Sequence, residues 1–409
     1  MKTIHATLTA FFILSLNLLP QSSASFPKDS DTPKVNINYI SSANEFGFRL
    51  LKTLASHDPA KNVFISPASI FIALSMTGDG AATGTEESIR TALQLKEFNT
   101  NEINESNAQL LKSLTLPDSS VELSIANSLW LNRPFILRPE FTYDCRQYYS
   151  AETYEKDFSD ANTTNELNKW VKDKTHGKIE KILDHLFQTD VLVILDAIYF
   201  YGKWTFPFDS SRTEKKPFFA LDGSEKQYPR MYQFKTFDYY DHSEFQAVSI
   251  PYGKRYSMYV FLPRERSGLP RFLRELDKMN WDRWMSRLSP REGTIGMPRF
   301  KIEYFASLVD VLKSLGMGIA FSAEADFSRM TQSSVCISDV VHKTYLEVNE
   351  QGTKAAAVTA IKISAISGAV TNPPKPFEMI IDHPFFCVIR DNTTGLVLFA
   401  GAIFDPTSD

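Results

Sequence analysis

The chain has 409 residues, of which 43% are hydrophobic and 22% are charged, and 31 are phenylalanines. This composition is typical of a folded globular protein with a large core, and it excludes a disordered chain, a collagen and a coiled coil. The formal net charge of −4 gives no electrostatic reason to expect nucleic acid or an anionic membrane as a partner.

The first 24 residues have the pattern of a secretory signal peptide. Lys2 precedes the apolar run of residues 8–19, Pro20 ends that run, and Ser22, Ser23 and Ala24 are small enough for a cleavage site. No later stretch has the roughly 18–20 apolar residues that a membrane span needs. We therefore expect residues 25–409 to form a secreted, extracellular protein. Three Asn-x-Ser/Thr sequons are candidate glycosylation sites in such a protein: Asn104, Asn162 and Asn392.

The N-terminal part of the mature chain has helical patterns over residues 44–114. Within it, Ser66 followed by Pro67 predicts an N-cap and the first turn of a helix that runs to residue 76. Further along, the patterns predict a strand at residues 121–131, a helix at 166–182 and a strand at 191–200. The last of these is an almost continuous apolar run, which is typical of a strand covered on both faces.

The C-terminal part is predicted to be mostly strand. The patterns predict several strands over 237–263, a helix over 269–288, a strand over 296–304, a helix over 307–315, and strands at 344–348, 385–390 and 396–404. No Pro/Gly-rich linker, repeat or low-complexity tract divides the chain. We therefore predict one large α+β domain.

Motifs for enzymatic or metal chemistry are weak or missing. The glycines at 78, 80 and 84 resemble a nucleotide-binding loop, but their spacing is off by one and a helical pattern precedes them where a strand is required. No His-Glu-x-x-His or Cys-x-x-Cys motif predicts a metal site, and no Gly-x-Ser-x-Gly motif predicts a hydrolase. Three cysteines (Cys145, Cys336 and Cys387) are too few for a disulfide framework.

Residues 350–366 do not behave like an ordinary strand. Sorted by strand parity, one face carries small or apolar residues from Thr353 to Ala365, and the other carries Lys354 and Lys362. Small side chains at 355–357 would let a strand enter a crowded gap, because each methylene forced into a packed core costs free energy. From the local residues alone, a plain surface loop with an alanine run, or a short helix, remains the alternative.

Residues 349–359 (Asn-Glu-Gln-Gly-Thr-Lys-Ala-Ala-Ala-Val-Thr) closely resemble the reactive-loop hinge of inhibitory serpins. The resemblance continues in ordered motifs over essentially the whole mature chain: residues 62–70, 80–85, 168–171, 175–179, 196–204, 297–302, 315–317, 382–385 and 399–401. It implies the serpin fold, with three β-sheets, eight or nine helices and an exposed reactive-centre loop at about residues 350–376.

The resemblance implies a suicide-substrate inhibitor of serine or cysteine endopeptidases. The protease forms an acyl-enzyme at the scissile bond, and the cut loop then inserts into the main sheet. Such a protein is consumed and is not an enzyme; the resemblance implies a covalent complex with a target serine protease, a monomer, no cofactor and no metal. The competing interpretation is a non-inhibitory serpin, a ligand carrier or chaperone, which usually has bulky, charged or proline residues at inward hinge positions.

Individual roles follow from the same resemblance. The hinge comprises Glu350, Gly352, Thr353, Ala355, Ala356, Ala357 and Thr359. The breach, where insertion begins, comprises Trp204, Arg299 and Glu350, and the shutter, which gates sheet opening, comprises Ser66, Ser69, Asp196 and His342. The family usually has Asn where this chain has Asp196. An ion pair with His342 would make opening depend on pH in the histidine range.

The scissile bond is predicted at Ile366–Ser367 from the family's usual loop length, which places Ile366 in an elastase-like or other apolar pocket. The stretch after Ser367 is longer than usual, so counting back from the prolines at 373 and 374 gives Val370–Thr371 as the alternative. Lys362–Ile363 suits a trypsin-like enzyme but lies early in the loop. Heparin is not an expected partner, because residues 86–114 contain only three basic residues, Arg90, Lys96 and Lys112.

Overall fold

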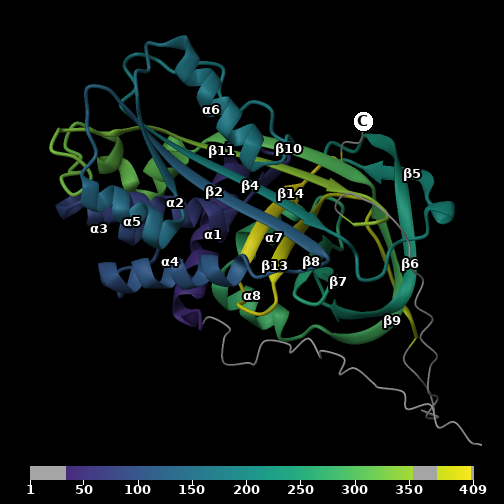
Figure 1. Ribbon diagram of the computed structural model, residues 1–409. Coiled ribbons are helices and arrows are strands. Elements are labelled where there is room, and N and C mark those ends of the chain that lie inside the picture. Colours follow the sequence, from purple (N-terminus) through teal and green to yellow (C-terminus); the bar gives the residue numbers. More distant parts are fainter. Residues whose placement is uncertain (1–33, 353–374, 407–409) are drawn as a thin grey trace, which may run out of the picture. The chain divides into compact units, whose positions relative to one another are not determined.

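The computed structural model describes residues 34–352 and 375–406, which belong to a compact unit that begins at Lys34. The described residues contain nine α-helices (Figure 1): α1 (Ile37–His57), α2 (Pro67–Asp79), α3 (Thr83–Ala92), α4 (Thr100–Leu114), α5 (Pro139–Tyr149), α6 (Ala161–Lys174), α7 (Leu269–Glu275), α8 (Lys278–Met285) and α9 (Val309–Leu312). None of the helices in these two ranges is both long and apolar enough to cross a membrane. The predicted signal peptide lies outside the described residues.

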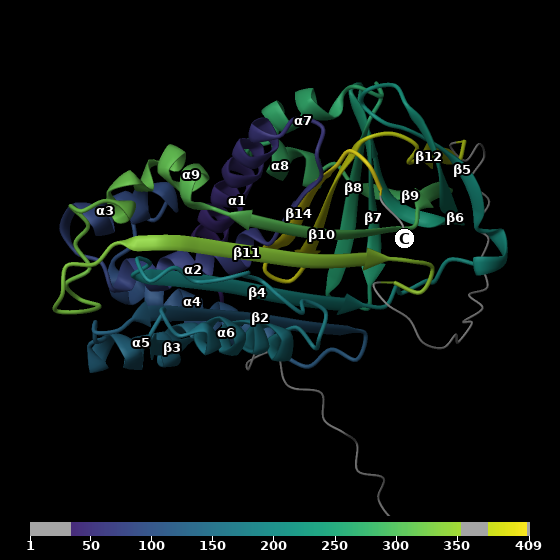
Figure 2. The ribbon, with the colours of Figure 1, turned by 90° about the horizontal axis from the view of Figure 1, so that it is seen from above.

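One sheet has five strands in the spatial order β10-β11-β4-β2-β3 (Figure 2): β10 (Phe300–Ser307), β11 (Ile337–Val348), β4 (Leu192–Gly202), β2 (Val121–Asn132) and β3 (Glu152–Lys156). Helix α6 covers one face of this sheet and α2 packs on the other. In β4, Val193 and Leu195 belong to the small core under α6, whereas Leu192 and Ile194 belong to the main core. Burial on both faces explains the predicted apolar run.

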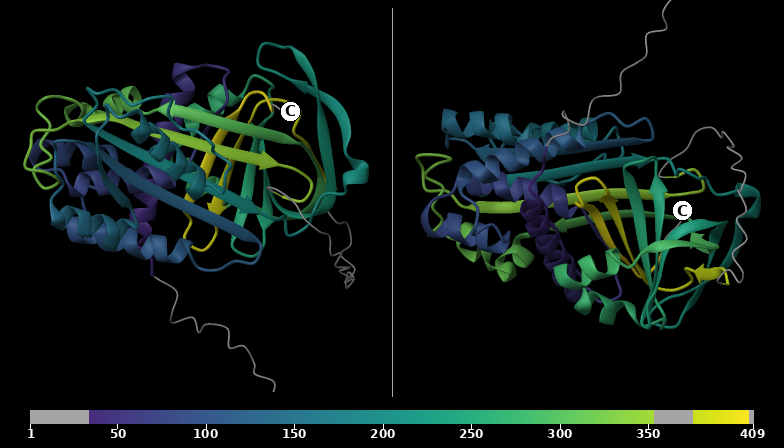
Figure 3. Two further views of the ribbon diagram at one scale, coloured as in Figure 1. Left: turned by 45° about the horizontal axis from the view of Figure 1, so that its top comes forward. Right: turned by 90° about the horizontal axis from the view of Figure 1, so that it is seen from below.

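The second sheet has nine strands. Eight follow the order β1 (Val63–Ile65), β14 (Val397–Ile403), β13 (Phe385–Asp391), β8 (Tyr256–Pro263), β7 (Phe245–Tyr252), β6 (Glu225–Asp241), β9 (Ser289–Pro298) and β12 (Phe377–Ile380); β5 (Glu214–Phe219) pairs with β6. Helix α1 packs on β14 and α7 packs on β8 (Figure 3). The α+β architecture is as predicted.

The number of sheets differs from the three expected, because the described strands form two hydrogen-bonded sheets. The reason is β6, a single strand of 17 residues. It pairs with β7 near Asp241, with β9 along its middle, and with β5 near Glu225. Two groups of strands are thereby joined into one continuous sheet.

The predicted single strand at 296–304 is wrong. β9 ends at Pro298 and β10 begins at Phe300, and the two strands lie in different sheets. Proline has no backbone N–H to continue a ladder, so the change of sheet occurs at the residue where pairing would be weakest.

The helix boundaries were predicted with mixed success. Ser66 caps α2 by accepting a hydrogen bond from the Ser69 backbone N–H, and Pro67 opens the helix, as predicted. The predicted helix at 166–182 ends at Lys174, because His176 and Gly177 adopt positive φ angles of 51° and 74°. The predicted helix at 269–288 is divided into α7 and α8, since Asp277 has an extended backbone and caps α8.

Candidate functional site

The site is centred on two neighbouring strands of the five-stranded sheet, β4 and β11. They are parallel to each other, with register partners from Leu192 and Ile337 to Ala197 and Lys343. Each is antiparallel to its other neighbour, β2 or β10. Beyond Ala197 and Lys343, the facing edges of β4 and β11 have no strand partner among the described residues. A strand running antiparallel to both would fit this gap in direction.

A tight turn follows β11 at the open end of this gap. Asn349 and Gly352 exchange backbone hydrogen bonds of 3.0 and 3.2 Å, and Gly352 bridges to Lys203 at the exit of β4. The φ angle of Gly352 is +133°, and a Cβ there would lie 2.1 Å from the carbonyl oxygen of Gly202. Only glycine fits this position, for both conformational and packing reasons.

The predicted breach residues meet at this turn. The carboxylate Oε1 of Glu350 accepts hydrogen bonds from Arg299 at 2.5 Å and from the Thr213 hydroxyl at 2.7 Å. The indole N–H of Trp204 donates to the carbonyl oxygen of Asn349 at 2.8 Å. Burial raises the pKa of Glu350, but the hydrogen bonds from Arg299 and Thr213 outweigh it, and the pKa lies below its ordinary value. Sequence reasoning missed Thr213, which no local pattern marks.

Replacing Arg299 with alanine is expected to destabilise the folded protein by about 1–2 kcal/mol at pH 7, because the buried Glu350 carboxylate loses a charged donor. This value allows for solvent screening, since the Arg299 side chain is 44% exposed. Because the folded-state pKa of Glu350 is lowered, its ionised form contributes stability above the unfolded-state pKa, and this contribution is lost as the pH falls through the folded-state pKa.

Urea unfolding at pH 7 and in acid checks this prediction. The difference in the free energy of unfolding between wild type and Arg299→Ala should become smaller in acid, as Glu350 becomes protonated. Exposed Arg274, at the end of α7, offers a matched control, since Arg274→Ala removes an arginine with no such partner. If Arg299→Ala and Arg274→Ala lost equal amounts of unfolding free energy, the stabilising role assigned to the Arg299–Glu350 pair would be contradicted.

The predicted shutter residues form a fully buried polar cluster. The Ser66 backbone N–H donates to Nε2 of His342 at 3.1 Å, and Nδ1 of His342 lies 2.9 Å from Oδ2 of Asp196. The Ser69 hydroxyl donates to the other oxygen of Asp196. Because Nε2 accepts from a backbone N–H, Nδ1 is the ring nitrogen that donates, and its N–H is directed at Asp196.

Asn127 is a further member of this cluster that sequence reasoning missed. It is the register partner of Asp196, which is in turn the register partner of His342, so the three lie in one row across β2, β4 and β11. Its side-chain oxygen is buried without a hydrogen-bond partner. Strand parity is the signal that could have found it, since the inward positions Leu129 and Leu131 share its face.

Lowering the pH from 8 to 5 is expected to accelerate spontaneous inactivation. Protonated His342 has N–H groups at both ring nitrogens, and the one at Nε2 would face the Ser66 N–H, so this tie between α2 and β11 would break. Asp196 is the charged side chain in contact with the imidazole among the described residues; α2 contributes only the serines. A rate that stays flat over this pH range would reject the hypothesis.

The three sequons differ in accessibility. The prediction of Asn104 as a glycosylation site is wrong for the folded protein, because this residue is only 5% exposed. Its side-chain amide donates a hydrogen bond to Asp79 at 2.9 Å, and its side-chain carbonyl accepts one from Tyr149 at 2.5 Å. Asn392 is exposed, but its amide donates to Ser257 at 2.9 Å. Asn162, near the start of α6, is exposed.

The cysteines have no reactive setting. Cys145 and Cys387 are buried and Cys336 is partly buried, all as free thiols. Burial raises the pKa of Cys387 to about 12, which disfavours the thiolate that reaction requires. In the part of the chain that the structure describes, no group of His, Cys, Asp and Glu side chains could hold a metal ion.

Several predicted residues lie outside the described residues. They are the hinge positions Thr353, Ala355, Ala356, Ala357 and Thr359 and the candidate scissile bonds Ile366–Ser367, Val370–Thr371 and Lys362–Ile363. The first described range ends with Gly352, which lies at the open end of the gap between β4 and β11.

Comparisons with known proteins agree with this geometry. A family model described as serpin (serine protease inhibitor) matches residues 41–406. Serpin-Z1B of Triticum aestivum is 33% identical over 391 residues, covering 90% of this chain and 96% of its own. Among solved structures, human thyroxine-binding globulin has a TM-score of 0.83 at 27% identity, covering 91% of this chain and 99% of its own. The thermophilic serpin tengpin, in its native state, has a TM-score of 0.83 at 29% identity, covering 91% and 95%. The chain belongs to the serpin family.

Proposed function

We propose that this serpin is a secreted suicide-substrate inhibitor of serine endopeptidases with elastase-like or other apolar-pocket specificity. The observation that carries the proposal is the parallel pair β4–β11. Beyond Ala197 and Lys343, the edges of these two strands that face each other lack strand partners among the described residues. The turn at Asn349–Gly352 lies at the end of that gap and reverses the chain, so that a following strand would run antiparallel to both β4 and β11.

The proposed reaction uses the loop as bait. The protease serine attacks the carbonyl carbon of Ile366, the Ile366–Ser367 bond breaks, and the amine of Ser367 leaves. The freed strand of 14 residues from Thr353 to Ile366, about 46 Å long when extended, then inserts between β4 and β11. Its end carries the esterified protease away from the turn. Distortion of the displaced protease prevents water from hydrolysing the ester, so the inhibitor is consumed in one turnover.

A ligand carrier or chaperone is the alternative, since the family also includes carriers such as thyroxine-binding globulin. Inhibition is favoured because the inward positions Thr353, Ala355, Ala357 and Thr359 are all small. Export through residues 1–24 and a glycan at Asn162 are parts of the proposal that fit an extracellular inhibitor.

Incubation with pancreatic elastase tests the function. The expected product is an SDS-stable complex with the mass of the protease plus the N-terminal fragment, together with a released peptide that begins at Ser367. A peptide that begins at Thr371 would move the scissile bond to the alternative, and one that begins at Ile363 would indicate trypsin-like specificity. Cleavage without a covalent complex across a panel of elastase-, chymotrypsin- and trypsin-like enzymes would favour the carrier.

A further inference from the structure

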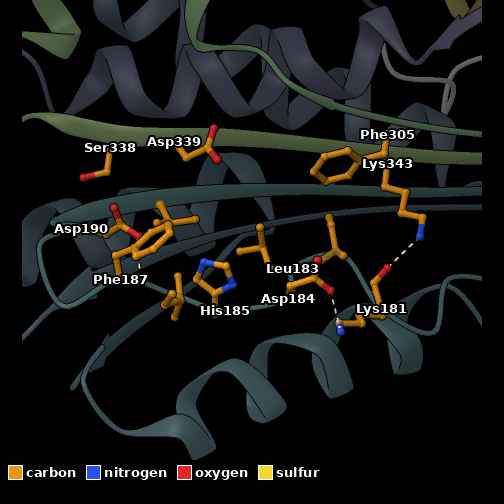
Figure 4. A pocket seen from close by; sticks show the side chains of 13 residues that line it. Lys181, Leu183, Asp184, His185, Phe187, Asp190, Phe305, Ser338, Asp339 and Lys343 are labelled. Atoms are coloured by element: carbon orange, nitrogen blue, oxygen red, sulfur yellow. Dashed lines mark hydrogen bonds and ion pairs between the residues drawn. The ribbon is translucent and has the colours of Figure 1, made fainter.

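A cavity of about 560 Å³ lies between β4, β10 and β11 and the irregular segment 181–190 that connects α6 to β4 (Figure 4). Val193 of β4, Asp339 and Lys343 of β11, and Phe305 of β10 contribute to its lining, as does Asp190, just before β4. Its walls therefore come from both sides of the β4–β11 pair.

The cavity spans the seam that must open in the proposed mechanism. Val193 and Asp339 are register partners across that seam, and two hydrogen bonds already tie its sides together. The Val191 backbone N–H donates to the Ser338 hydroxyl at 2.7 Å, and the Lys343 ammonium donates to the Lys181 carbonyl at 2.8 Å. One inserted strand would move the two walls apart by about 4.8 Å, so a ligand that touches both walls would lose half of its contacts.

Two carboxylates at one end of the cavity have hydrogen-bond donors but no paired cation. Asp190 accepts from the Phe187 backbone N–H at 2.9 Å and Asp339 accepts from the Ser307 hydroxyl at 2.6 Å, and neither forms an ion pair with a described lysine or arginine. Of the two lysines in the lining, Lys181 pairs with Asp184 at 2.6 Å and Lys343 is bound to a carbonyl oxygen. Burial, together with the nearby Asp190, raises the pKa of Asp339 despite a hydrogen bond from Ser307. A bound cation would relieve this repulsion.

Aromatic rings are exposed at the same cavity. Phe187 is 58% exposed and Phe305 is 52% exposed, and both line the cavity, with the His185 ring 4.3 Å from Phe187 in an edge-on arrangement. Exposed large apolar side chains gathered at a concave site are typical of ligand recognition. Ring faces also attract cations, especially where water is partly excluded.

We propose that this cavity binds a small organic cation with an apolar body, an arylalkylamine, and that it does so only while β4 and β11 are paired. The ammonium would lie between Asp190 and Asp339, and the apolar body against Phe187 and Phe305. The second half of the proposal rests on the proposed function. By linkage, a ligand at 100 times its dissociation constant favours the closed sheet by about 100-fold. It would slow loop insertion and raise the number of inhibitor molecules cleaved per protease trapped.

Titration of tryptamine into the intact secreted protein, followed by calorimetry, tests the site, with indole-3-propionate as an anion of similar shape. Tryptamine is expected to bind at least 10-fold more tightly than the acid. The double variant Asp190→Asn/Asp339→Asn should lose at least 10-fold in affinity. The matched control Asp173→Asn removes a carboxylate of α6 that pairs with Lys169 and does not line the cavity, and it should change affinity less than twofold.

Three outcomes would overturn the proposal. The first is that neither tryptamine, benzylamine nor a phenethyl-trimethylammonium ion binds; the second is that the acid binds equally well; the third is that the double variant binds like wild type. Equal affinity for the intact and the loop-cleaved protein would overturn the link to the seam. The proposed function is tested independently by the SDS-stable complex, which forms without any amine, so the two failures are distinguishable.

Discussion

Ala355→Arg is expected to turn the protein from an inhibitor of elastase-like peptidases into their substrate. In the proposed insertion, Ala355 faces inward together with Thr353 and Ala357. The inward face of β11 there is fully apolar, with Leu346 and Val348 at 1% and 0% exposure. An unpaired guanidinium that enters this core costs several kcal/mol.

When loop insertion is slower, hydrolysis of the acyl-enzyme occurs before the protease is trapped. Each 1.4 kcal/mol added to the insertion barrier slows that step about tenfold, so the stoichiometry of inhibition should rise by at least about tenfold while the loop is still cut. Titration of residual elastase activity measures the stoichiometry, and denaturing gels show whether complex or cleaved inhibitor accumulates.

Ala356→Arg is the matched control, because it makes the same chemical change at the adjacent position of opposite parity. Outward positions at this level of β11, such as Tyr345 and Glu347, are only partly buried, so an arginine there keeps contact with water. This variant should remain an inhibitor. An unchanged stoichiometry of inhibition for Ala355→Arg would count against insertion of this segment.

Sequence patterns correctly predicted those elements whose ends depend only on neighbouring residues, such as a helix cap. The N-cap Ser66 and Pro67 begin α2 as expected, and the apolar run at 191–200 is a doubly covered strand. Boundaries determined by tertiary pairing were not predicted. The division between β9 and β10 reflects two different sheets, and the length of β6 reflects three successive partners.

The candidate site was predicted where a family pattern marks single residues, and missed where a contact depends on distant segments. Trp204, Arg299 and Glu350 come together as the resemblance implied, but Thr213 reaches Glu350 from 137 residues away, a separation at which no sequence period operates. The sequon at Asn104 fails for a related reason, since its pattern is local whereas its burial depends on contacts with Asp79 and Tyr149.

Cleavage of the loop is expected to raise the melting temperature. In the intact protein, the facing edges of β4 and β11 beyond Ala197 and Lys343 lack strand partners among the described residues. Insertion of residues 353–366 would pair those edges and bury one face with two isoleucines and three alanines. Burial of these side chains contributes roughly 5–8 kcal/mol. With an unfolding entropy of roughly 0.8 kcal/mol/K for a chain of this size, this raises the melting temperature by about 6–10 °C.

Calorimetry of intact protein and of protein nicked within the loop by a non-target peptidase measures this difference. Ala355→Arg provides the internal comparison, because nicking should raise its melting temperature much less than it raises that of wild type. The trap needs free energy that is released only after the bond is cut, since otherwise nothing would oppose hydrolysis of the acyl-enzyme. If nicked and intact wild type unfolded at the same temperature, the gap between β4 and β11 would be a feature of the architecture alone, and the inhibitory mechanism would be lost with it.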